Sequence, residues 1–113
     1  MSRKIKLMAD YFCYPLWWVE SGKYGDINPD DLPLSPDTIK SLIKWSDIYN
    51  ATFNDNYPPD SRFPSLADEL AFESEGIRLW LKVQQELKNQ YEIIYYSYLE
   101  RKVIDVIDPV TVG

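Results

Sequence analysis

The sequence has no histidine and a single cysteine, Cys13, among its 113 residues. Histidine is the side chain that most often serves as a general base and as a metal ligand near neutral pH, so both roles lose their usual residue. One cysteine cannot form a disulfide within the chain or a cysteine-based zinc cluster. Ser35, Ser41 and Ser46 have no histidine to activate them as nucleophiles. We therefore expect a protein that is not an enzyme.

Glycine and long apolar runs are also scarce. Four glycines do not make a glycine-rich phosphate loop. No apolar run approaches the roughly 20 residues that a membrane-spanning helix needs. Residues 1–10 are basic, but their apolar stretch is too short for a secretory signal. We expect no membrane contact and a reducing, cytoplasmic location.

The composition is that of a folded protein with an uneven charge. Hydrophobic residues at 45% and charged residues at 27% are typical of one domain, here residues 1–113. Residues 26–75 hold eleven carboxylates and three cations, a net charge of −8, whereas the rest of the chain carries +2. This charge disfavours binding to nucleic acid and attracts a basic protein. The simpler interpretation is a solvated surface that keeps the protein soluble.

Two helices are predicted. Ser35 followed by Pro36 is typical of a helix start, because the serine hydroxyl accepts a bond from a free N–H and proline loses only an unpaired donor. Residues 36–53 then show helical spacing, and residues 65–89 form a second helix with a serine at its start. Gly76 within it marks a close approach or a kink. The main buried stripe expected for this helix is Leu66, Leu70, Ile77, Trp80, Leu81 and Leu87.

Alternating and β-branched patterns predict strands at residues 5–11 and 91–98, with a weaker strand at 102–107. Residues 11–19 are expected to be irregular or, less favoured, a short strand. Residues 20–34 are expected to form a loop. The predicted fold class is α+β, a small sheet of two or three strands packed against two helices. The predicted order is strand, loop, helix, helix, strand and an optional last strand, and the two helices allow the flanking strands to pair in parallel.

Two carboxylate patterns suggest an alternative function. Asp26, Asn28 and Asp30 have the spacing at the start of a calcium-binding loop, but aspartates replace its required glycine and its last glutamate. Asp10, at the end of a predicted strand, could supply one acid of a hydrolase site, although no second acid is placed beside it. We expect no metal and no cofactor. A small carboxylate-based metal-binding module or enzyme remains the alternative.

Aromatic residues make up 15% of the chain. The runs at residues 11–18 and 95–98 are expected mostly in the core, yet a small sheet cannot cover all of them. Some tyrosine or tryptophan side chains should therefore lie exposed beside the acidic segment, where they suit protein binding. The predicted partner-binding residues are Asp26, Asp30, Asp31, Asp37, Asp47, Asp55, Glu69, Glu73, Trp18 and Tyr24.

Three stretches carry a resemblance to a known family. They are M-A-D-Y-x-x-Y-P-L-W at residues 8–17, D-I-N-P-D-D-L-P-L-S-P at residues 26–36, and a helix containing Trp45 and Tyr49. The sequence resembles the immunity proteins of bacterial contact-dependent growth inhibition and related polymorphic toxin systems. This resemblance implies a protein that binds and neutralises the toxic domain delivered by a neighbouring cell, frequently a nuclease.

The resemblance and the charge lead to one hypothesis. We expect a non-enzymatic inhibitor whose acidic, aromatic-flanked surface binds a basic toxin domain, with no nucleic acid and no membrane among its partners. A cytoplasmic protein-interaction adaptor is a further alternative.

Overall fold

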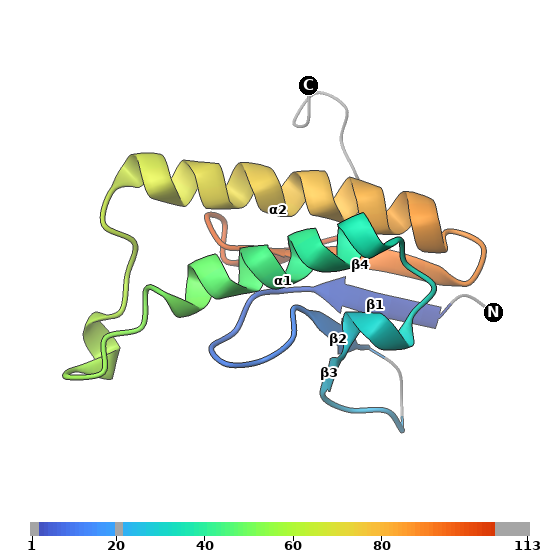
Figure 1. Ribbon diagram of the computed structural model, residues 1–113, viewed down its shortest axis with the longest axis horizontal. Helices are drawn as coiled ribbons and strands as arrows, with labels where there is room; N and C mark the ends of the chain where they lie inside the picture. The colour runs from blue at the N-terminus through green and yellow to red at the C-terminus, as the bar shows by residue number, and fades with distance from the viewer. Residues whose placement is uncertain (1–2, 20–21, 106–113) are drawn as a thin grey trace.

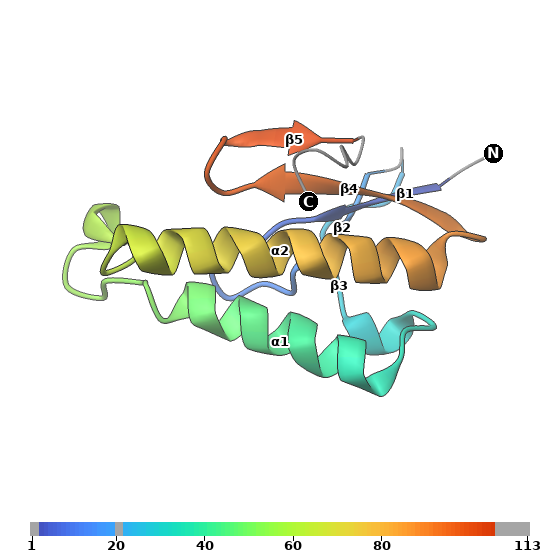
Figure 2. The same ribbon diagram turned by 90° about the horizontal axis from the view of Figure 1, so that it is seen from above.

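The structure is a computed structural model that describes residues 3–19 and 22–105. Within these residues, two helices lie on one side of a five-stranded sheet (Figures 1 and 2). The strands are β1 Arg3–Leu7, β2 Leu16–Trp18, β3 Asp26–Ile27, β4 Tyr91–Ser97 and β5 Lys102–Ile104. The helices are α1 Pro36–Asn50 and α2 Leu66–Leu87, with 3₁₀ turns η1 at Pro29–Asp31 and η2 at Pro58–Asp60.

The sheet has the order β3-β2-β1-β4-β5. Strand β1 pairs in parallel with β4, with Ile5 opposite Ile93, and all other pairs are antiparallel. The helix pair between β3 and β4 carries the chain back to the start of the sheet, which a parallel pair requires. Figure 2 shows α1 and α2 side by side against this sheet.

The α+β class with two helices is confirmed, but the prediction of two or three strands is wrong. Strand β2 occupies part of residues 11–19, and β3 and η1 lie inside the predicted loop at 20–34. These strands are two or three residues long, too short to show an alternating pattern. Strand β2 forms by pairing with β1, and β3 forms by pairing with β2. Strand β1 ends at Leu7, and Val106 and Ile107 of the last predicted strand lie outside the described residues.

Helix α1 begins at the predicted Pro36, and α2 begins at Leu66, one residue after the predicted start, with Ser65 as its cap. The Ser35 hydroxyl accepts a bond from the Thr38 N–H at 3.3 Å, and the Ser65 hydroxyl accepts one from the Asp68 N–H at 3.2 Å. Helix α1 ends at Asn50, three residues before the predicted end, in a turn. In the part of the chain that the structure describes, neither helix is long and apolar enough to cross a membrane.

The core lies between the helices and the sheet. Trp45 of α1 stacks on Phe72 of α2 with ring centroids 4.5 Å apart, and its indole N–H donates to the Phe72 carbonyl. Gly76 faces this contact, because a Cβ atom there would lie 2.8 Å from the Trp45 ring and closer still to the Tyr95 hydroxyl of β4. The predicted close approach at Gly76 is confirmed. Two members of the expected buried stripe of α2, Leu66 and Leu70, are instead exposed.

Candidate functional site

Two of the predicted acidic residues meet at the surface. Asp26 of β3 and Asp47 of α1 line the same hollow, which has a volume of about 350 Å³. We call it the acidic hollow. Its other lining residues are Phe12, Cys13, Tyr14, Ile43, Ser46 and Asn50. The hollow therefore lies between α1, the first residue of β3 and the connection from β1 to β2.

The connection from β1 to β2 is fixed to both neighbouring elements. The Phe12 N–H donates to the Asn50 amide oxygen at 2.9 Å, and the Tyr14 N–H donates to the Asp26 carboxylate at 2.7 Å. The Ser46 hydroxyl donates to the Cys13 carbonyl at 3.1 Å. Because three consecutive residues of the turn are bonded to α1 or to β3, the acidic hollow has a preformed rim.

Phe12 has the most unusual conformation at this rim. Its φ angle is 60°, in the left-handed region that costs a residue other than glycine about 1–2 kcal/mol. Its side chain is nevertheless 69% exposed and touches Phe53 only at a ring edge, with centroids 5.2 Å apart. Tyr14 is 40% exposed. Backbone strain that holds large aromatic side chains towards solvent is typical of functional surfaces.

The acidic hollow has an unbalanced charge. Within the described part of the chain, neither Asp26 nor Asp47 has a cation within ion-pair distance. Burial, and then the charges of Asp10 and Asp26, raise the pKa of the Cys13 thiol. That thiol therefore stays protonated at neutral pH and is a poor nucleophile. The hollow suits recognition of a cation better than covalent chemistry.

The other predicted acids are spread more widely. Asp30 and Asp31 lie exposed on η1, and Asp37 lies in the first turn of α1, about 15 Å along the helix from Asp47. Asp55 lies exposed in the connection between the helices. Lys40 and Lys44 are also exposed on α1, so this helix does not carry a uniformly acidic face.

Glu73 requires a correction. Its side chain is 7% exposed, and its carboxylate accepts bonds from the Tyr95 hydroxyl at 2.9 Å, the Ser97 hydroxyl at 2.5 Å and the Tyr98 N–H at 3.0 Å. These donors from the end of β4 draw the carboxylate inward, so Glu73 is not part of an exposed binding surface. Glu69, one turn earlier, is half-buried and accepts a long bond from the Tyr98 hydroxyl.

The predicted aromatic residues lie away from the acidic hollow. Trp18 is half-buried, with the Lys23 ammonium 4.4 Å from its ring centroid. Tyr24 is 88% exposed in the turn before β3 but does not line the hollow. The aromatic residues that line the acidic hollow are Phe12 and Tyr14. The sequence predicted that the aromatic run containing them would lie mostly in the core. The one sequence signal for their exposure is the turn that Asp10 begins before Pro15.

The residues that suggested a metal or hydrolase site accept hydrogen bonds from nearby backbone N–H groups instead. Asn28 caps η1 by accepting the Asp30 N–H at 3.0 Å, and Asp10 accepts the Tyr11 N–H at 2.8 Å. Across residues 3–19 and 22–105, no three acidic or cysteine side chains converge on a position that could hold a metal ion. The alternative therefore gains no support from this geometry.

Comparison with known proteins agrees with the resemblance seen in the sequence. Residues 3–98 match the family model described as Serratia CdiI immunity protein-like. No curated protein matches the sequence. The matched segment contains the acidic hollow, both helices and strands β1 to β4. The chain therefore belongs to the Serratia CdiI immunity protein-like family.

Proposed function

We infer from membership of this family that the chain is an immunity protein, which neutralises a cognate toxin. We propose that it does so by binding a basic toxin domain at the acidic hollow. The observation that carries this proposal is the pairing of Asp26 and Asp47, both without an ion-pair partner in the described residues, with the exposed rings of Phe12 and Tyr14.

The charge of the surface favours a toxin that acts on nucleic acid. A nuclease that binds phosphates presents cationic side chains, and an acidic surface can occupy the same groups. Complementary charge accelerates association, whereas rigid aromatic anchors mainly slow dissociation. Inhibition by occupancy needs no catalytic group and no cofactor. A nuclease delivered into the cell acts in the cytoplasm, so we place the complex there.

The remaining predicted residues form the outer part of the proposed surface. Asp30, Asp31 and Asp37 extend it along η1 towards the start of α1, whereas Asp55 lies beyond the end of α1. Glu69, Trp18 and Tyr24 lie further out, where their contribution to steering and contact would be smaller. Charged residues at an interface rim affect the association rate more than the stability of the complex.

The test uses the purified cognate toxin domain, which is first identified among the genes that flank the gene for this chain. Asp47→Lys reverses a charge in the acidic hollow, and Asp105→Lys makes the same change beyond β5, at the opposite edge of the sheet. We expect Asp47→Lys to slow association at low salt by about tenfold and to weaken its salt dependence. Asp105→Lys should have a much smaller effect. Identical association rates for the two variants across a salt series would contradict the proposal.

Phe12 can be tested separately from charge. Phe12→Ala removes the exposed ring and leaves both carboxylates in place. If Phe12 is an anchor, the loss of about 2 kcal/mol expected for such a residue accelerates dissociation by roughly 30-fold with little change in association. Tyr57→Ala is the matched control, because Tyr57 is also exposed but lies outside the acidic hollow. Equal dissociation rates for both variants would remove Phe12 from the surface.

A further inference from the structure

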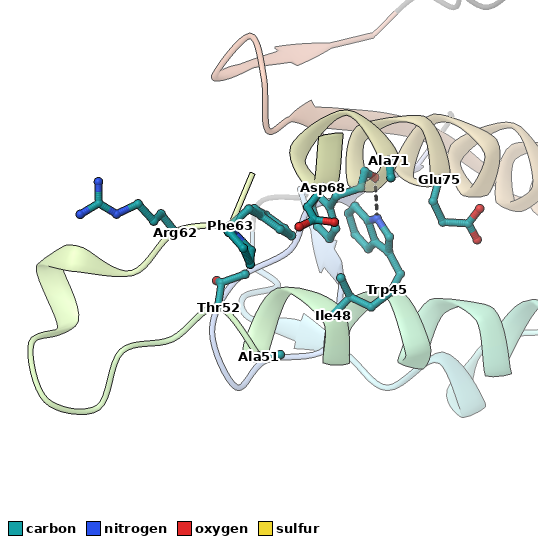
Figure 3. A pocket seen from close by; sticks show the side chains of 11 residues that line it. Trp45, Ile48, Ala51, Thr52, Arg62, Phe63, Asp68, Ala71 and Glu75 are labelled. Carbon is teal, nitrogen blue, oxygen red and sulfur yellow. Dashed lines mark hydrogen bonds between the residues drawn. The ribbon is translucent and has the colours of Figure 1, made fainter. Parts of the chain in front are cut away.

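A second hollow lies between the two helices. It has a volume of about 390 Å³ and opens between the second half of α1 and the first half of α2 (Figure 3). We call it the helix groove. Ile48 and Ala51 line it from α1, and Ala71 lines it from α2. All three are exposed, while the buried rings of Trp45 and Phe72 close its base. The groove is therefore an apolar recess with exposed aliphatic side chains at its mouth.

The helix groove and the acidic hollow share one helix. Asp47 lines the acidic hollow, and the next residue, Ile48, lines the helix groove. The second half of α1 is thus a ridge with a recess on each side. An α-helix with its side chains is about 10 Å wide. A typical protein interface covers about 800 Å² of each partner, so one partner seated on this ridge spans both recesses.

The charged residues that line the helix groove indicate which kind of side chain it can bind. The Asp68 carboxylate points into the groove in Figure 3, and within the described residues it has no cationic partner. The other charges are already paired. Glu75 receives two bonds of 2.7 Å from Arg78, and Arg62, which points away from the groove, pairs with Asp60. The Asp68 carboxylate accepts a hydrogen bond from the Ser65 hydroxyl at 3.1 Å, and among the described residues its negative charge is not balanced by a cation. The groove therefore offers apolar surface and one carboxylate whose charge is unpaired.

We propose that the toxin domain bound at the acidic hollow also inserts an apolar side chain, flanked by a lysine or arginine, into the helix groove. This inference rests on the proposed function and extends it. The apolar side chain fills the recess between Ile48 and Ala71, and the cation pairs with Asp68. The interface is then centred on the second half of α1, and each recess contributes its own anchor.

The test is to fill the groove and to compare the result with an equally bulky change elsewhere on α2. Ala71→Trp places an indole at the groove, and Gln85→Trp places one on an exposed position about 21 Å further along the helix. Binding is measured by titration calorimetry against the same cognate toxin domain. We expect Ala71→Trp to weaken binding at least tenfold and Gln85→Trp to change it less than twofold. Asp68→Asn, which keeps the size of the side chain, should weaken binding about fivefold.

The outcomes separate this inference from the proposed function. If the Asp47 variant loses binding but Ala71→Trp and Asp68→Asn bind as the unchanged protein does, the groove inference is overturned and the proposed function stands. If the unchanged protein itself does not bind the toxin domain, both fail. Thermal unfolding of each variant shows that it is folded. If Ala71→Trp does not fold, Asp68→Asn decides alone. Binding by Asp68→Asn as tight as that of the unchanged protein then overturns the inference.

Discussion

Gly76 is the position where a single methyl group should have the clearest effect on folding. A Cβ atom there would lie 2.8 Å from Cζ2 of Trp45 and even closer to the Tyr95 hydroxyl. Carbon atoms in contact normally lie about 3.5–4.0 Å apart. Neither neighbour can move aside easily. Trp45 is bonded to the Phe72 carbonyl, and Tyr95 is bonded to the Glu73 carboxylate. The methyl group would therefore force α2 away from both α1 and β4.

The expected magnitude follows from two opposed effects of Gly76→Ala. Alanine favours the helical backbone over glycine by about 1 kcal/mol. Overpacking a tight core typically costs about 1–3 kcal/mol. The upper part of that range applies here because the methyl group would clash with two rigid, fully buried side chains. We expect a net destabilisation of about 1–2 kcal/mol. For a domain of this size, each kcal/mol lowers the unfolding midpoint by roughly 4 °C.

Thermal and urea unfolding of Gly76→Ala measure this effect. Ser74→Ala is the matched control, because Ser74 is exposed on the same helix and should gain a few tenths of a kcal/mol from helix propensity alone. Tyr95→Phe removes the oxygen that the new methyl group meets, so Gly76→Ala should cost less in that background. If Gly76→Ala stabilises the protein as much as Ser74→Ala does, the helix and sheet are not packed as closely as described.

Three further predictions concern one buried and two half-buried polar groups. Glu73→Gln should lower stability by about 2–3 kcal/mol in urea unfolding, because the amide N–H₂ replaces one oxygen that accepts hydrogen bonds. Burial raises the pKa of Glu86, but hydrogen bonds from Thr38 and Ser35 outweigh it and leave the pKa lowered. Stability should therefore fall as the pH drops through that lowered pKa, and Glu86→Gln should flatten this dependence. Burial raises the pKa of Tyr49 to about 12, so stability should fall as the pH rises above about 10, where the unfolded tyrosine ionises. The part of the 295 nm titration that Tyr49→Phe removes should then be centred near pH 12 in the folded protein.

The helices were predictable because their signals are local. A serine that caps the first turn and the 3.6-residue spacing act within a few residues, and both caps form as expected. The stripe of α2 was less predictable, because this helix contacts both α1 and β4 and is apolar on several sides. Leu66 and Leu70 have the correct spacing but lie on a flank that the described residues leave exposed. Periodicity gives the existence of a helix more reliably than the direction of its buried face.

The short strands and the acidic hollow depend on contacts between distant residues. Strand β3 pairs with β2 over only two residues, which is too short for a sequence pattern to predict it. Asp26 and Asp47 are 21 positions apart and meet because α1 packs beside the edge of the sheet. Glu73 was wrongly predicted for the same reason. Its charge predicted an exposed side chain, but the hydrogen-bond donors that hold it in the interior come from β4 and the residue after it, which are distant in sequence.

Helix α1 serves the core and the proposed interface with different residues, and this separates stability from binding. Trp45 faces α2 and holds the helix in place, whereas Asp47 and Ile48 face solvent on the two sides of the ridge. Asn50 then fixes the rim that presents Phe12. A change at an exposed ridge residue should therefore alter toxin binding at nearly constant stability. A change at Trp45 should alter stability first, and it should alter binding only by displacing the ridge. A rigid helix of this kind presents its anchors without the ordering cost that a flexible loop incurs on binding.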